Sequence, residues 1–348
     1  MGKGPNQARG EITLRPAICS ALALAVILGG CAWCKSKAQD GAPQNLVRAE
    51  ALIASAEELA RWPNLALFDI PASSFRYTSE EVLRTDRYVV RHITFPSPFN
   101  SPYPANNVVH AEYYLPAGKG PFPAVIMLHN LKDDFTLSRI ICSILASEGI
   151  AALMLEMAYY GERKPVDASG QPIGLKDLDR MTAEPLRQTV MDVRRARQML
   201  EAFPEAEKRH IGIAGLSFGA IVASLAAGVD GKFDRCVFIL GGGKFADIIW
   251  ESPAAASIKK RLMEKGETLE TLREELKPVE PTEYASRVDS SKALMLNVKD
   301  DDWIQREATV ALWEALGKPR IVWYSGSHLG AVVHLYAMIR RTAEYIKE

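Results

Sequence analysis

Short apolar runs that alternate with segments of helical character constrain the fold of this chain most strongly. The runs cover residues 124–128, 151–155, 211–214, 236–240, 293–298 and 321–324. Helices are expected at about residues 135–147, 186–203, 218–228, 254–275, 304–316 and 329–346. Apolar runs without polar alternation are typical of strands buried on both faces. Their alternation with helices predicts an α/β fold, with a mostly parallel twisted sheet and helices on both of its faces.

The segments ahead of these runs have a different character. Residues 88–95 and 110–115 alternate at period two and predict an antiparallel pair at the start of the sheet. Residues 45–62 carry apolar side chains at helical spacing and predict an accessory helix that Pro63 ends. We therefore expect an N-terminal helical accessory segment over residues 45–84 and a main domain over residues 85–348.

Two connections within that main domain are unusually long. They cover about residues 158–184 and 241–292. Long connections in a compact domain are usually functional, so these two are expected to form loop or cap insertions around a site.

The first thirty residues predict a targeting segment. A basic start precedes an apolar run over residues 17–28, which is shorter than the roughly 20 residues of a membrane span. Leu28-Gly29-Gly30-Cys31 then resembles the lipobox of bacterial lipoproteins. That resemblance implies cleavage before Cys31, a lipid on its thiol, and a lipid-anchored place in the bacterial cell envelope, on the outer membrane or periplasmic face of a Gram-negative cell. Residues 31–44 would be the tether. The alternative is an ordinary secretory signal with an incidental cysteine.

The charge balance and the cysteine content indicate which ligands and partners are not expected. The 42 Lys and Arg residues balance 42 Asp and Glu residues, so charge gives no reason to expect a nucleic-acid partner. The five cysteines follow no metal-binding or disulfide pattern. Cys142 and Cys236 lie in apolar stretches and are expected in the core. We expect neither a metal nor a cofactor, and the oligomeric state stays open.

The segment Gly215-Leu216-Ser217-Phe218-Gly219 places one serine between an expected strand and an expected helix. A sharp turn at this point tolerates little side chain, which explains the glycines at positions 215 and 219. The turn would hold the serine oxygen above the sheet, where the helix N-terminus points its free N–H groups. Ser217 is therefore the candidate nucleophile.

From this motif the chain resembles the α/β-hydrolase family, and within it the dienelactone hydrolase-like and acetyl-esterase-like branch, over roughly residues 85–348. That family orders its triad as serine, acid and histidine. Asp301, in an acidic turn after the apolar run 293–298, falls on the family's aspartate, although Val298 and Gln305 replace a glycine and a proline. The alternative is a solvated turn and helix cap, and we favour that alternative for the neighbouring Asp300 and Asp302.

His328 falls on the family's histidine, in the turn Ser325-Gly326-Ser327-His328-Leu329-Gly330. The resemblance implies that His328 takes the proton of Ser217 during acyl transfer while Asp301 orients the imidazole. Two N–H donors would stabilise the negative oxygen. One is expected at Phe218, and the other at Leu131, because His129-Asn130-Leu131 stands where the family commonly has His-Gly-x.

Other polar residues near the expected strand ends are weaker candidates. Tyr160 and Arg163 begin the first long connection and should border the site. Arg163 could bind a substrate carboxylate, although we favour an internal pairing that holds the loop. Arg194 and Arg195 are expected on the solvated face of a helix, and His334 is expected to be a packing residue.

Three functions compete at this point. The first is a serine carboxylesterase that acts on a small-molecule ester and is anchored to an envelope membrane. The second is a serine peptidase with the same triad. The third is a non-catalytic envelope lipoprotein that binds a ligand or a partner.

Overall fold

A computed structural model describes residues 44–348, except residues 133, 168–170 and 172–181. The predicted signal peptide, Cys31 and almost all of the predicted tether therefore lie outside the described residues. The chain from Ala42 to Glu348 forms one compact unit. None of the helices found in the described residues combines the length and the apolar character needed to cross a membrane.

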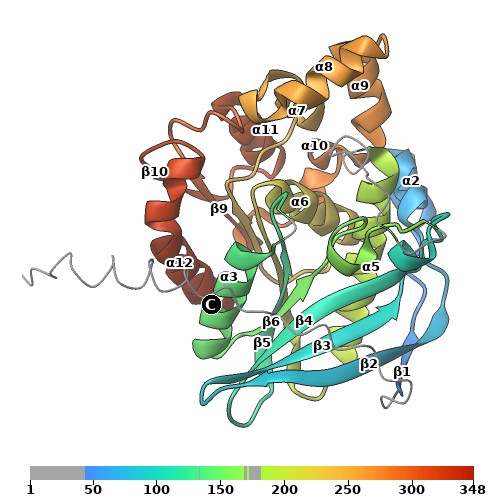
Figure 1. The fold of residues 1–348 in the computed structure, drawn as a ribbon, viewed down its shortest axis with the longest axis vertical. Helices are drawn as coiled ribbons and strands as arrows, with labels where there is room; N and C mark the ends of the chain where they lie inside the picture. The colour runs from blue at the N-terminus through green and yellow to red at the C-terminus, as the bar shows by residue number, and fades with distance from the viewer. Residues whose placement is uncertain (1–43, 133, 168–170, 172–181) are drawn as a thin grey trace, which may run out of the picture. The chain divides into compact units, whose positions relative to one another are not determined.

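One mixed sheet forms the centre of the described domain (Figure 1). Its strands are β1 (Gln44–Ala49), β2 (Ser73–Arg84), β3 (Tyr88–Pro96), β4 (Val108–Pro116), β5 (Phe122–Leu128), β6 (Ala151–Leu155), β7 (Ala206–Leu216), β8 (Cys236–Ile239), β9 (Ala293–Val298) and β10 (Arg320–Tyr324). They lie in the order β1-β2-β3-β4-β6-β5-β7-β8-β9-β10. The first four pair antiparallel, and the strands from β6 to β10 pair parallel. The expected α/β fold is confirmed.

Helices cover both faces of this sheet (Figure 1). The longer ones are α3 (Thr136–Ser147), α5 (Ala183–Ala202), α6 (Phe218–Asp230), α11 (Arg306–Ala315) and α12 (Leu335–Lys347). Helices α3 and α12 contact each other, and so do α5 and α6. The expected core residues Cys142 and Cys236 are fully buried. Because the parallel strands β5, β6, β7 and β9 end at one edge, residues that follow them can meet there.

The expected helix over residues 45–62 is wrong. Strand β1 occupies the first part of this segment and pairs antiparallel with β2, which is a second unexpected strand. Val47 and Ala49 are buried while Leu46 and Arg48 are exposed, so the side chains alternate as in a strand. Only α2 (Ala56–Arg61) is α-helical, and it begins at a capping box that Ser55 forms with its third helical residue.

The expectation that Arg194 and Arg195 lie on a solvated helix face is also wrong. Arg194 and Arg195 are buried because the segment ahead of β3 packs over this helix. Arg194 donates a hydrogen bond to the carbonyl of Phe68, in the 3-10 helix η1 (Pro63–Phe68), and pairs with Asp230. Arg195 donates to the hydroxyl of Ser73 and to a backbone carbonyl of β3. The N-terminal segment is therefore an integral layer of the domain.

The connection over residues 241–292 is largely helical. It contains α7 (Phe245–Glu251), α8 (Ala256–Glu264), α9 (Leu269–Leu276) and α10 (Pro281–Tyr284). The single helix expected over residues 254–275 is interrupted at Gly266, whose positive φ of 83° is not helical. Helices α7, α8 and α9 lie together at one end of the domain (Figure 1). The connection over residues 158–184 begins with a 3-10 turn, η3 (Gly161–Arg163), and most of the remainder lies outside the described residues.

Candidate active site

Ser217 occupies the sharp turn between β7 and α6. Its φ of 55° and ψ of −119° are strained for a residue with a side chain. The flanking glycines are required by close backbone approach: a Cβ at Gly215 would overlap the carbonyl of Gly219, and a Cβ at Gly219 would overlap the carbonyls of Leu128 and His129. The turn therefore has the geometry expected from the two glycines.

The structure brings Ser217, His328 and Asp301 together. The Oγ of Ser217 lies 2.9 Å from the Nε2 of His328. The Nδ1 of His328 lies 2.8 Å from the Oδ2 of Asp301 and 3.0 Å from its Oδ1. The side chains of His328 and Asp301 are almost fully buried. We call this hydrogen-bonded chain of three residues the relay.

The relay defines the direction in which a proton can move. A carboxylate only accepts hydrogen bonds, so the contact with Asp301 places a proton on the Nδ1 of His328. In the neutral imidazole the Nε2 is then an acceptor that faces the hydroxyl of Ser217. The arrangement can remove a proton from Ser217 as that oxygen attacks an electrophile.

The acidic turn after β9 holds the relay by further hydrogen bonds. The Oδ1 of Asp301 accepts the backbone N–H groups of Trp303 and Ile304 at 2.9 and 2.8 Å. The carboxylate of Asp302 accepts the backbone N–H of His328 at 3.2 Å. Asp302, expected to be only a solvated cap, therefore ties the turn that carries Asp301 to the turn that carries His328.

The expected N–H donors Phe218 and Leu131 belong to two segments that meet at the turn of Ser217. Phe218 is the first residue of α6, where a backbone N–H has no acceptor within its own helix. Leu131 is half-buried in the loop after β5, and the close approach of Gly219 to the end of β5 brings that loop beside the turn. Their roles as donors to a negatively charged oxygen stay predictions.

Tyr160 packs against the same turn. Its ring is buried, and its centroid lies 4.9 Å from that of His129 and 6.5 Å from that of Phe218. His129 accepts the backbone N–H of Met157 on its Nε2 at 3.1 Å, which ties the loop after β5 to the end of β6. Tyr160 therefore lies beside the candidate site, and its expected contact with substrate stays a prediction.

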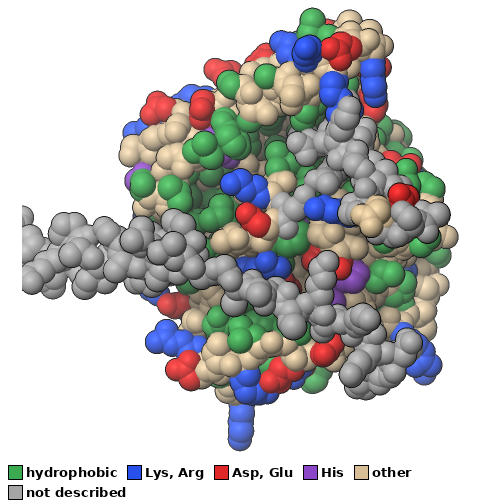
Figure 2. Space-filling model, in the orientation of Figure 1, with side chains coloured by type: hydrophobic (Ala, Val, Ile, Leu, Met, Phe, Trp, Pro, Cys, Tyr) green, Lys and Arg blue, Asp and Glu red, His purple; other side chains and the backbone are tan. Residues whose placement is uncertain are grey.

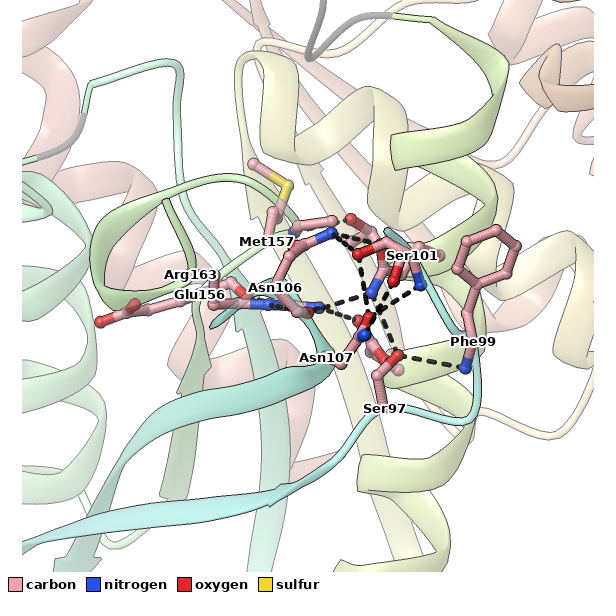
Figure 3. A network of polar contacts seen from close by, with 12 residues as sticks. Ser97, Phe99, Ser101, Asn106, Asn107, Glu156, Met157 and Arg163 are labelled. Carbon is pink, nitrogen blue, oxygen red and sulfur yellow. Dashed lines mark hydrogen bonds and ion pairs between the residues drawn. The ribbon is translucent and has the colours of Figure 1, made fainter. Parts of the chain in front are cut away.

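The possible substrate contact of Arg163 is wrong, because its guanidinium belongs to a network of polar contacts inside the fold (Figure 3). Its side chain is fully buried inside the fold and forms an ion pair of 2.7 Å with Asp192 of α5. It also donates 2.9 Å hydrogen bonds to the carbonyls of Asn106 and Glu156. The internal pairing that we favoured is the one found, because this guanidinium has its charge partner within the core.

The same network fixes the backbone of the loop that leads to Tyr160 (Figure 3). The side chain of Asn106 accepts the N–H of Tyr159 at 2.9 Å, and that of Thr189 accepts the N–H of Ala158 at 3.1 Å. Asn106 also donates to the side chain of Gln188 at 2.7 Å. These partners are 31 to 82 residues apart, and no local pattern in the sequence connects them.

The buried carboxyl group of Glu156 also holds the loop that carries Tyr160. Glu156 follows β6, and one of its oxygens accepts the N–H of Glu162 at 2.8 Å. Burial raises the pKa of Glu156 to about 7, although that hydrogen bond acts in the opposite direction. Burial likewise raises the pKa of Asp192, against the opposing effect of Arg163.

An apolar surface begins directly after His328. Leu329, Val332, Val333 and Tyr336 are between 61% and 78% exposed, in the 3-10 helix η8 (Leu329–His334) and at the start of α12. Figure 2 shows hydrophobic side chains gathered on this side of the domain, near β10 and α12. The expected packing residue His334 is partly exposed and contacts the ring of Tyr324. The relay thus lies beside an apolar stretch of surface.

This chain is similar in sequence to known proteins. Residues 109–266 match the sequence model of the Dienelactone hydrolase family. The Bacillus subtilis (strain 168) protein described as uncharacterized protein YdjC is 24% identical over 112 residues, which are 32% of this chain and 97% of that protein.

Two solved structures share the fold. The acetyl xylan esterase from Paenibacillus sp. R4 superposes with a TM-score of 0.61 at 20% identity, over 86% of this chain and 96% of that protein. Acetyl xylan esterase 1 from Thermoanaerobacterium sp. JW/SL YS485 superposes with a TM-score of 0.56 at 14% identity, over 76% of this chain and 87% of that protein. At these identities the likeness concerns the fold.

Proposed function

We propose, from the premise that this chain is an α/β-hydrolase of the dienelactone hydrolase branch, that it hydrolyses carboxylic esters through an acyl-enzyme intermediate on Ser217. The observation that carries the proposal is the relay, with contacts of 2.9 Å from Ser217 to His328 and 2.8 Å from His328 to Asp301. A serine hydroxyl is a weak nucleophile by itself, and an adjacent base oriented by a third group is what activates it.

In the first half of the reaction, the Oγ of Ser217 attacks the ester carbonyl carbon while its proton moves to the Nε2 of His328. The carbonyl π electrons move to the oxygen, and the backbone N–H groups of Phe218 and Leu131 are the proposed donors to it. Collapse of this intermediate breaks the bond to the alcohol oxygen, and His328 returns the proton to that leaving group. Asp301 stabilises the imidazolium while the charge lasts.

In the second half, water replaces the alcohol. His328 removes a proton from the water as its oxygen attacks the acyl carbon. The bond to the Oγ of Ser217 then breaks, and that oxygen recovers a proton from His328. The products are the free acid and the unchanged enzyme, so no cofactor is needed to balance the reaction.

Support for an ester as substrate comes from the family and from the names of similar proteins. The matching family is named for a hydrolase of a lactone, which is a cyclic ester. Two proteins of similar fold are acetyl xylan esterases. We therefore propose a small-molecule ester as substrate.

A direct comparison of substrate classes tests the reaction type. Purified protein that lacks the predicted signal peptide should hydrolyse p-nitrophenyl acetate or butyrate with a higher kcat/KM than any p-nitroanilide peptide. Peptide cleavage that exceeds ester cleavage would favour the peptidase. Absence of both activities, in a folded protein, would favour a non-catalytic binding protein.

We further propose that the mature protein is anchored in a bacterial envelope membrane through a lipid on Cys31. The support is the order of basic start, short apolar run and Gly-Cys within residues 1–31. The twelve residues from 32 to 43 would span at most about 40 Å when extended. Cys31→Ser should release the protein from the membrane fraction of expressing cells, and Cys34→Ser should not; retention of Cys31→Ser would overturn the anchor.

A further inference from the structure

The imidazole of His328 has an aromatic partner outside the relay. The ring of Trp303 stacks on it, with ring centroids 4.8 Å apart and planes inclined by 15°. Trp303 is half-buried, and its backbone N–H is bound by Asp301. The turn that presents the carboxylate to the Nδ1 of His328 therefore also lays an indole over the face of the same imidazole.

We propose that Trp303 is a positioning residue of this site, which holds the His328 ring in the plane of the relay and stabilises the imidazolium that forms during acyl transfer. The inference rests on the proposed function and adds a contact to it. It assigns to Trp303 an effect on the chemical step rather than on the binding of substrate.

The stacked indole restrains the orientation of the His328 ring. Hydrogen bonds to Ser217 and Asp301 use the two nitrogen atoms of the imidazole, which lie on the edge of the ring. Those bonds do not restrain tilting of the ring out of its plane. An indole in near-parallel contact with one face blocks tilting toward that side, so the Nε2 stays directed at the serine oxygen.

The stacked indole also favours the charged form of His328 electrostatically. The face of an indole is the negative part of its quadrupole, and it attracts a cation within about 6 Å of the ring centroid. The neutral imidazole of the resting enzyme gains little from this field, whereas the imidazolium of the transition state gains more. An interaction that strengthens in the transition state raises kcat.

Variants of Trp303 distinguish the positioning of His328 from direct contact between Trp303 and the substrate. Trp303→Leu should lower kcat about 10-fold with KM within 2-fold of wild type, and Trp303→Phe should retain about a third of wild-type kcat. Trp323→Leu is the matched control, because Trp323 is a half-buried tryptophan of β10 that stacks with Arg306, at 4.7 Å. This control should keep wild-type kinetics.

Fluorinated tryptophan tests the electrostatic part without removing the ring. Protein in which all six tryptophans carry fluorine should lose kcat in steps as the number of fluorine atoms rises, because fluorine weakens the ring quadrupole. The same labelling of the Trp303→Phe variant should leave kcat unchanged. This series retains the native residue, so it gives an answer even where Trp303→Leu fails to fold.

Three results would overturn the inference. One is a rise in KM at constant kcat in Trp303→Leu, which would make Trp303 a substrate wall. The second is a wild-type kcat that does not change with fluorination. The third is an equal change of kcat on fluorination in the wild type and in Trp303→Phe. Failure of the proposed function itself would be seen separately, as absence of ester turnover by the wild-type protein.

Discussion

The guanidinium of Arg163 lies 2.7 Å from the carboxylate of Asp192, and neither side chain is exposed to solvent. The pair joins the loop that carries Tyr160 to the middle of α5. Because Tyr160 packs beside the turn of Ser217 through the ring of Phe218, a structural ion pair in the core supports a loop beside the candidate site.

We expect Arg163→Met to destabilise the fold rather than to alter substrate choice. Its removal leaves Asp192 buried without the partner of this ion pair, and breaking a buried pair in this way typically costs about 3–5 kcal/mol. Urea unfolding at pH 7 should show this loss. Arg320→Met is the control, because its pair with Glu348 is exposed at 3.7 Å and such pairs contribute about 1 kcal/mol or less. An Arg163→Met protein of normal stability, with raised KM for acidic esters alone, would restore Arg163 as a substrate ligand.

The turn that carries Ser217 should not tolerate a methyl group at Gly219. A Cβ there would overlap the carbonyl oxygens of Leu128 and His129, so the loop after β5 would have to move. We expect Gly219→Ala to lower kcat at least 10-fold and stability by about 1–3 kcal/mol. Gly330→Ala, where the nearest atom is the hydroxyl of Ser327 at 3.2 Å, is the control and should change both quantities little. Equal behaviour of the two variants would contradict the geometry.

Asp301→Asn should affect catalysis with little effect on substrate binding. An amide can donate to the Nδ1 of His328 and so favours the wrong tautomer, and such a change lowers kcat by about 10⁴ in a serine protease. Steady-state kinetics should show this loss with KM nearly unchanged. Asp300→Asn is the matched control, since Asp300 is the exposed neighbour in the same turn. Loss of activity in both variants would assign the effect to the turn rather than to one carboxylate.

The buried carboxyl group of Glu156 should lower the free energy of unfolding of the domain as the pH rises. Burial raises the pKa of Glu156 to about 7 from its ordinary value of 4.5, so between these values the unfolded chain has lost a proton that the folded protein keeps. The free energy of unfolding should therefore fall from about pH 4.5 to about pH 7, by on the order of 2–3 kcal/mol.

The variant Glu156→Gln isolates this contribution, because an amide oxygen can still accept the N–H of Glu162. It should be more stable than wild type at pH 8 and similar to it at pH 4.5, as measured by urea unfolding. Glu344→Gln, at an exposed carboxylate of α12, should follow the wild-type pH dependence. If the free energy of unfolding of Glu156→Gln falls with pH as steeply as that of the wild type, the pH dependence belongs to other groups.

The sequence predicted the parts of this molecule that local pattern determines. The strands β5 to β10 are apolar runs long enough to be recognised singly, and Ser217 has its glycines beside it. His328 and Asp301 were found because each follows an expected strand and falls on a triad position that the resemblance to the α/β-hydrolase family implies. The contact between them, 27 residues apart, follows from the shared edge of a parallel sheet.

The parts that the sequence did not predict depend on distant partners. Leu46, Ala49 and Leu52 are spaced as on a helix, and only the pairing with β2 decides that the segment is extended. Arg194 was expected in solvent because its helix was considered without the layer that covers it. Trp303 was passed over because a tryptophan in a turn gives no sign that a histidine 25 positions later will stack on it.

The most direct test of the proposed function is covalent labelling of the protein that lacks residues 1–30 with a fluorophosphonate, followed by mass spectrometry of the labelled peptide. We expect one phosphonylated residue, Ser217, and no labelling in Ser217→Ala. Ser224 is a buried serine of α6, the helix that follows Ser217, and it donates only to a backbone carbonyl. The variant Ser224→Ala should therefore be labelled like the wild type. An intact, folded protein that stays unlabelled, or that is labelled at another serine, would contradict the proposed function.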